Sequence, residues 1–150
     1  MENWQDLKLT GDVLTRSAGR LADTDALVCG DVCLSYGQMD GAANQVANAL
    51  LALGLERGAK VAIMARNVPE YALVYFGVAR SGQVLVHIST RYIASELSWV
   101  LEESDSEVLI VEAAFADVAK AALADCTRIR HLVVIADYED AHPVPGGVTS

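Results

Sequence analysis

Apolar and polar residues alternate along the chain in blocks that have the periods of helices and strands. The clearest block follows Ser35, which forms with Gln38 the pattern of a capping box at the start of a helix. Apolar residues then recur at every third or fourth position, as on the buried face of a helix, and Gly54 stands where a left-handed residue often ends one. The apolar positions of this helix are Met39, Ala43, Val46, Leu50 and Leu53.

Short apolar runs and longer helical segments alternate after this first helix. Strands separated by helices of ten to fifteen residues are typical of right-handed crossovers in a parallel sheet. The sequence therefore predicts an α/β fold with a mostly parallel sheet that is covered on both faces. We expect strands over 60–65, 84–88, 107–112 and 131–137, and helices from Pro69 to a stop at Gly82, over 94–104 and over 113–124.

The residues before Ser35 and the last residues of the chain do not follow this alternation. A helix is expected from a cap at Thr10 to about Leu21. The run ALVCGDVCLS predicts two short strands around a tight turn at Gly30 and Asp31. Residues 139–150, EDAHPVPGGVTS, have the prolines, glycines and charges of a surface loop or a truncation point.

Composition and charge exclude several classes of function. The 150 residues are 53% hydrophobic and 21% charged, which is typical of globular proteins. Twenty acidic residues against eleven basic ones give a net charge of -9, which repels phosphate backbones and makes nucleic acid a poor candidate partner. No apolar run approaches the roughly 20 residues that span a bilayer, and no apolar signal region opens the chain. We expect a cytoplasmic protein without a membrane span.

The cysteines and histidines do not form a recognisable metal or catalytic motif. Cys29, Cys33 and Cys126 make neither an even disulfide set nor the close pairs of a zinc site. Cys29 and Cys33 lie in apolar runs, so we expect both to be small buried hydrophobic residues. His131 and His142 are too far apart to suggest a metal pair. No glycine-rich phosphate loop with a lysine and no G-x-S-x-G elbow is present. We predict no metal site.

Polar residues follow three of the expected strands, at the edge where ligands usually bind in an open parallel sheet. Arg66 and Asn67 follow the first strand, Arg91 lies in the loop after the second, and Glu112 ends the third. Each arginine could bind a phosphate or carboxylate through its guanidinium, or could be solvated or paired with a nearby acid. Asn67 could simply cap a helix. His87 could be a base or ligand, or a residue of the core or rim.

Two motifs resemble the N-terminal portion of the adenylate-forming, or AMP-binding, superfamily. This superfamily includes acyl-CoA synthetases, luciferases and the adenylation domains of nonribosomal peptide synthetases. The run LSYGQM at 34–39 is similar to the first core motif of the family, and ARSGQVLV at 79–86 is similar to the second. The spacing between the two also fits, and the resemblance extends over 21–134.

The loop after the second motif both follows the family and departs from it. Arg91 and the later pair Glu96-Leu97 match the arginine and the Glu-Leu of the family's next loop and helix. The family usually has proline where His87 stands, asparagine at Ser89 and often proline at Thr90. Within this resemblance, His87 and Arg91 are the candidate substrate-binding residues.

The resemblance implies the N-terminal part of the large domain of a ligase, most like an acyl-CoA synthetase such as a fatty-acid-CoA ligase. In that reaction a carboxylic acid attacks the α-phosphate of ATP to give an acyl-adenylate and pyrophosphate, and coenzyme A then displaces AMP. Full-length family enzymes use ATP, Mg²⁺ and coenzyme A through motifs that lie C-terminal to the matched segment.

Two alternatives follow from the absence of those motifs in residues 1–150. One is an N-terminal segment of a ligase, without catalytic residues or cofactors of its own and inert alone, whose substrate is a fatty or aromatic acid. The other is a free-standing, non-catalytic module of the same fold that serves in binding or in the formation of homo-oligomers.

Overall fold

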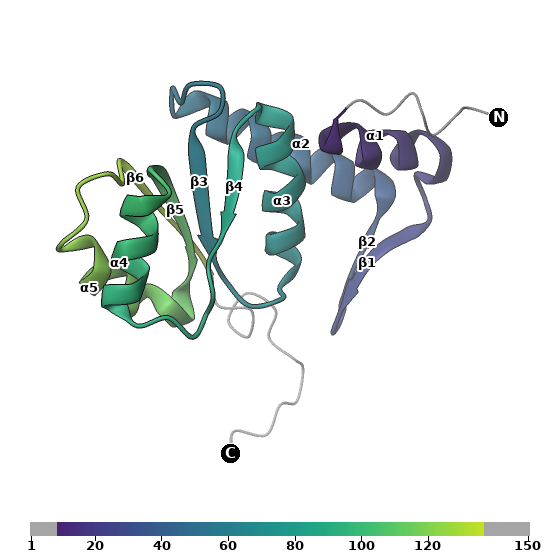
Figure 1. The fold of residues 1–150 in the computed structure, drawn as a ribbon. Coiled ribbons are helices and arrows are strands. Elements are labelled where there is room, and N and C mark those ends of the chain that lie inside the picture. The colour runs from purple at the N-terminus through teal and green to yellow at the C-terminus, as the bar shows by residue number, and fades with distance from the viewer. Residues whose placement is uncertain (1–8, 137–150) are drawn as a thin grey trace, which may run out of the picture. The chain divides into compact units, whose positions relative to one another are not determined.

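Strands and helices alternate in the computed structural model as the sequence predicts (Figure 1). The structure describes residues 9–136. These residues divide into two compact units, each made of two stretches of sequence. Unit 1 holds the described residues up to Ala59 together with Pro69–Leu85, and unit 2 holds Lys60–Val68 together with the described residues from Val86 onward.

Unit 1 consists of helices and one antiparallel hairpin. The hairpin turns at Gly30, which has a positive φ of 54°, as the first central residue of a type II′ turn requires. At the start of the next helix, Ser35 Oγ accepts the Gln38 N–H at 3.3 Å and Gln38 Oε1 accepts the Ser35 N–H at 2.9 Å, so the capping box is confirmed. The elements are α1 (Thr10–Leu21), β1 (Asp25–Cys29), β2 (Val32–Ser35), α2 (Tyr36–Ala52) and α3 (Pro69–Ser81).

Two expected helix starts differ in the structure. Leu9, not Thr10, precedes the first residue of α1, so the predicted Thr10 cap is wrong. The cap bond comes from inside the helix instead, because the Asp12 carboxylate accepts the Leu9 N–H at 3.1 Å. The helix expected to begin at Ala113 starts with a single 3₁₀ turn, and its α-helical part begins at Ala116.

Arg80 of α3 ties the helices of unit 1 together. Its guanidinium donates to Thr15 Oγ1 of α1 at 2.8 Å, to Asn44 Oδ1 of α2 at 2.8 Å and to the Asp40 carbonyl at 2.9 Å, and it pairs with the Asp40 carboxylate. The Arg80 side chain is only 10% exposed. A buried charge with several partners is costly to leave unpaired, so Arg80 fixes how the helices of unit 1 pack.

Replacing Arg80 tests this role. Arg80→Ala leaves the Asp40 carboxylate without its partner, so we expect the free energy of unfolding to fall by about 3–5 kcal/mol in urea titrations. Arg128→Ala is the matched control, because Arg128 is 55% exposed and pairs with the surface acids Glu102 and Asp105. We expect that control to lose less than about 1 kcal/mol. Equal losses for the two variants would contradict the role given to Arg80.

The sheet of the protein has the strand order β4-β3-β5-β6. β5 pairs with β3 on one side and β6 on the other, both in parallel. Val84 N–H donates to Ala59 O and Ile88 N–H to Ile63 O at the same residue offset, which is the pattern of parallel strands. The prediction of an α/β fold with a parallel sheet is confirmed. The strands are β3 (Lys60–Met64), β4 (Val84–His87), β5 (Ser106–Glu112) and β6 (His131–Ile135).

Two helices pack on one face of this sheet in unit 2, α4 (Ala94–Glu103) and α5 (Ala116–Leu123), the latter preceded by the 3₁₀ turn η2 (Ala113–Phe115). Alternate residues of the strands face them, which is the period of two of an extended chain. The opposite-facing residues Val108 and Ile110 of β5 are buried as well. The core between sheet and helices contains Ala62, Met64, Leu97, Leu101, Leu109, Val111, Ala119 and Ala122.

Candidate functional site

The carboxyl ends of β3 and β5 are joined by an ion pair between Arg66 and Glu112. Arg66 N–H donates to Glu112 Oε2 at 2.8 Å, Arg66 Nε donates to Oε1 at 2.9 Å, and Arg66 Nη2 also contacts Oε1. The Glu112 side chain is completely buried, whereas the Arg66 side chain is 45% exposed. Of the two possibilities for Arg66, pairing with an acid is therefore the one that the structure contains.

This pair limits what Arg66 can bind. A buried carboxylate needs a compensating charge and hydrogen bonds, and Arg66 supplies both to Glu112. Because its charge is already matched, Arg66 attracts a phosphate or carboxylate ligand only weakly. The pair instead fixes the start of the loop after β3, where Val68 N–H turns back to Arg66 O at 2.9 Å.

The two candidate substrate-binding residues lie at the carboxyl end of β4: His87 is the last residue of the strand, and Arg91 lies in the loop that follows. Both side chains are exposed, so His87 is a residue of the rim and not of the core. Two bonds to Ser89 shape the loop: its Oγ accepts the Arg91 N–H at 3.3 Å and its carbonyl accepts the Tyr92 N–H at 3.2 Å. The structure thus turns the loop tightly between Ser89 and Tyr92 and leaves the Arg91 guanidinium open to solvent.

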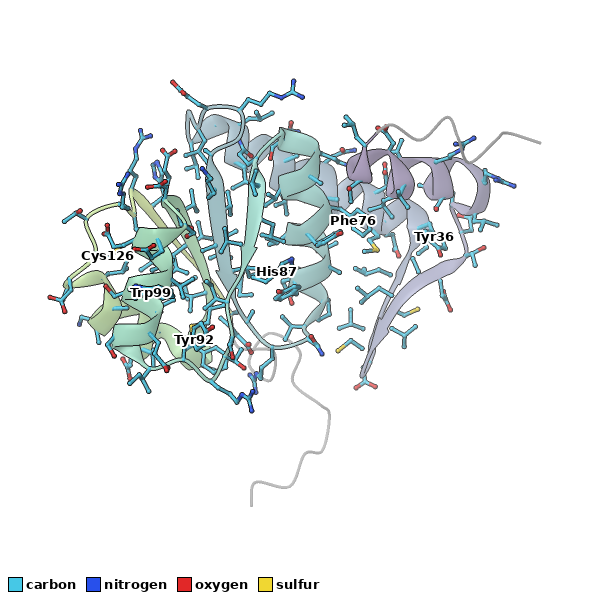
Figure 2. All side chains as sticks on the ribbon, viewed as in Figure 1. Tyr36, Phe76, His87, Tyr92, Trp99 and Cys126 are labelled. Atoms are coloured by element: carbon cyan, nitrogen blue, oxygen red, sulfur yellow. The ribbon has the colours of Figure 1, made fainter. Side chains whose placement is uncertain are left out.

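An open hollow of about 310 Å³ lies on the outer face of α4. It is lined by Tyr92, Ser95, Glu96, Trp99 and Val100, and Trp99 is 65% exposed (Figure 2). The sequence places Trp99 off the apolar stripe of its helix, but the hollow beside it was not predicted. The helical spacing of Ser95, Glu96 and Trp99 is the signal that could have found it, because residues three and four apart share one face.

Cys33 and Cys126 are not activated thiols. Cys33 is exposed, so the expectation that it is buried is wrong, since one side of the short β1–β2 hairpin is open to solvent. A hydrogen bond to the Asp25 side chain raises the pKa of the Cys33 thiol, with smaller contributions from desolvation and from the Asp25 charge. Burial is the main reason why the pKa of the Cys126 thiol is also raised. A raised pKa keeps a thiol protonated and unreactive.

Two features, a cluster of metal ligands and a helix that could span a bilayer, are missing from residues 9–136. Within that range, no three His, Cys, Asp or Glu side chains lie together so that they could hold a metal ion. Among the same residues, no helix has the length and apolar character needed to cross a bilayer. The surface loop or truncation point that the sequence predicts over 139–150 lies outside the described residues.

Comparisons with known proteins agree on one family. The family model of the AMP-binding enzyme matches residues 14–146. A medium/long-chain-fatty-acid–CoA/3-oxocholest-4-en-26-oate–CoA ligase of Mycobacterium marinum is 30% identical over 129 residues, which is 86% of this chain and 24% of the ligase. The long-chain-fatty-acid–CoA ligase FadD13 of Mycobacterium tuberculosis is 41% identical over 91 residues, or 61% of this chain and 18% of that ligase.

Solved structures show the same likeness in three dimensions. The anthranilate CoA ligase AuaEII in complex with anthranoyl-AMP has a TM-score of 0.83 at 28% identity, covering 89% of this chain and 27% of that one. The N-terminal domain of FACL13 from Mycobacterium tuberculosis has a TM-score of 0.81 at 33% identity, covering 86% of this chain and 34% of that one. This chain spans about a quarter of the length of the Mycobacterium marinum ligase.

Removing either partner of the Arg66–Glu112 pair should have unequal effects. Arg66→Ala leaves the buried Glu112 carboxylate without a partner, so we expect a loss of about 3–5 kcal/mol in the free energy of unfolding. Glu112→Ala should cost less, because the Arg66 side chain already reaches solvent. Glu103→Ala, at an exposed site of α4, should stay within about 0.5 kcal/mol of the wild type. Urea titration measures all three, and a larger loss for Glu112→Ala would refute this description of the pair.

Proposed function

Because this chain belongs to the AMP-binding enzyme family, we propose that it is the N-terminal segment of the large domain of an ATP-dependent acyl-CoA synthetase. The observation that carries the proposal is the continuous match of the family model over residues 14–146. The acid to be activated is a fatty or aromatic one. Support comes from relatives named as fatty-acid–CoA ligases and from the likeness to an anthranilate CoA ligase.

The proposed reaction has two steps. The carboxylate of the acid attacks the α-phosphate of ATP, the bond to pyrophosphate breaks, and an acyl-adenylate forms. The thiol of coenzyme A then attacks the acyl carbon, and AMP leaves. Both steps depend on groups that stabilise negative charge on the phosphates.

His87 and Arg91 are the residues of this segment that we propose to contact substrate. They flank the loop at the carboxyl end of β4, the edge at which parallel sheets usually bind ligands. Arg91 is exposed and offers a permanent positive charge with several N–H donors to a phosphate or carboxylate. His87 offers ring nitrogens that can donate or accept a hydrogen bond at the same rim.

The segment by itself is proposed to be inert. Its described residues hold no group of metal ligands, so the Mg²⁺ of the family reaction would be bound elsewhere in the ligase. The ATP and coenzyme A contacts would come mostly from the part of the relatives' length that this chain does not span. We place the ligase in the cytoplasm.

Pyrophosphate exchange tests whether the isolated segment is inert. We expect the 150-residue chain to incorporate no labelled pyrophosphate into ATP with any fatty or aromatic acid, while the full-length ligase that carries the segment does so with its own acid. Exchange catalysed by the isolated chain would show that the segment contains its own adenylation site. No exchange by the full-length ligase, with acids from acetate to long-chain and aromatic ones, would refute the proposed reaction.

Arg91 is tested in that full-length ligase. If its guanidinium contacts a substrate phosphate or carboxylate, Arg91→Ala should raise the KM for ATP, acid or coenzyme A by roughly 10–100-fold, as the loss of a charged hydrogen bond does. Arg91→Lys should recover part of the loss because the charge remains. Arg128→Ala is the control, since Arg128 pairs with Glu102 and Asp105 on the surface. Unchanged KM values for all three substrates in Arg91→Ala would remove Arg91 from the site.

A second candidate function is a free-standing, non-catalytic module that forms homo-oligomers. The observation that favours it is the exposure of three apolar residues in the middle of β6, Leu132, Val133 and Val134. Such a surface is usually covered by another chain or another part of the same chain. This candidate requires a stable oligomer of the isolated 150-residue chain.

A further inference from the structure

The hollow on the outer face of α4 has a lining that the proposed function does not use. Figure 2 shows Tyr92 just before the helix and Trp99 on it, and Ser95, Glu96 and Val100 complete the lining. Within residues 9–136, this lining contains two aromatic rings, one aliphatic side chain and one acid, but no base. At about 310 Å³, the hollow is near the lower end of the range for small-molecule sites.

Glu96 gives the hollow a negative charge. Its Oε2 accepts the Ile93 N–H at 3.0 Å, and this bond at the start of α4 holds the carboxylate in place. Within the described residues, no lysine, arginine or histidine forms an ion pair with Glu96. The amino end of a helix carries roughly half a positive charge, which is less than the full negative charge of the carboxylate. The hollow therefore favours a cation, in a chain whose net charge is -9.

Trp99 and Tyr92 bring aromatic rings to the same hollow. Trp99 is 65% exposed, so much of its indole ring is open to a ligand. The face of an aromatic ring attracts a cation, and the attraction is strongest for tryptophan. Val100 adds aliphatic surface that can contact the apolar part of a ligand. Aromatic rings beside a carboxylate are the groups that recognise an organic cation.

We propose that this hollow binds a small alkylammonium ion. Trp99 and Tyr92 contact the ammonium group and its alkyl chain, and Glu96 supplies the opposite charge. An ammonium fits better than a guanidinium, because a guanidinium binds best to both oxygens of a carboxylate and the helix start already uses one oxygen of Glu96. The inference goes beyond the proposed function and does not rest on it.

The size of the hollow favours a free ion over a lysine side chain of another protein. Stable protein–protein interfaces bury about 1,200–2,000 Å² in total. The lining comes from the short stretch 92–100 alone, which offers only a small part of such an area. A free alkylammonium ion needs no more surface than this stretch provides.

An NMR titration of the 150-residue chain with butylammonium tests the site. We expect the indole N–H signal of Trp99, identified by its absence from Trp99→Leu, to shift with a dissociation constant in the millimolar range. The affinity is weak because an exposed ring and an exposed carboxylate each contribute little. 1-Butanol has the same alkyl chain without the charge, so it should bind at least about threefold more weakly.

Two charge variants show whether Glu96 itself is responsible. Glu96→Gln removes the charge but keeps an oxygen that can accept the Ile93 N–H, and it should weaken butylammonium binding about two- to fivefold. Glu103→Gln removes the same charge from another exposed site of α4 and should bind like the wild type. Equal effects of the two variants would overturn the site, because the chain would then attract cations only through its net charge.

Trp99→Leu shows whether the ring is needed. We expect butylammonium binding to weaken about two- to fivefold, as followed by the amide signals of α4, and Trp99→Phe to recover part of the loss. The replaced side chains are exposed, so the variants should fold, and their NMR spectra check this. Unchanged affinity in Trp99→Leu, or equal binding of butylammonium and 1-butanol, would refute the proposal. Binding of acetyl-Gly-Lys-Gly amide more than about tenfold tighter than butylammonium would overturn the free ion as the occupant.

Discussion

The burial of β5 on both faces is the constraint on which unit 2 depends. A strand without an exposed face must be apolar along its whole length, and Val108 to Val111 satisfy this condition. The polar side chain at the end of this strand then has to find its hydrogen-bond partners inside the protein. Glu112, which ends β5, is completely buried and accepts three hydrogen bonds from Arg66. The site at the carboxyl edge is therefore shaped by the need to compensate one buried carboxylate.

This compensation divides the roles of the polar residues at that edge. Arg66 pairs with Glu112 and holds the loop after β3, whereas His87 at the end of β4 and Arg91 in the loop after it are exposed. Ile88 N–H, bonded to Ile63 O, connects that second loop to β3. Arg66 is thus paired with a buried carboxylate, whereas Arg91 is the exposed arginine that we propose to contact substrate.

Local signals in the sequence were enough to predict most of the helices and strands. Contacts between residues far apart in the sequence could not be predicted in this way. The capping box at Ser35 and the left-handed Gly54 and Gly82 mark helix ends through contacts within a few residues, so the ends of α2 and α3 could be predicted. The Arg66–Glu112 pair joins residues 46 positions apart, and its register cannot be derived from either local sequence. The exposure of Cys33 was missed for a similar reason, because an apolar run does not show which of its faces other elements cover.

The central claim is that this chain is one segment of an acyl-activating ligase, and the intact mass of the protein in its native source tests it most directly. The chain alone has a mass of 16.0 kDa and spans 24% of a related ligase. We expect the native polypeptide to have a mass several times larger than 16.0 kDa. A native polypeptide of 16.0 kDa would contradict the claim and leave a non-catalytic module as the function of this fold.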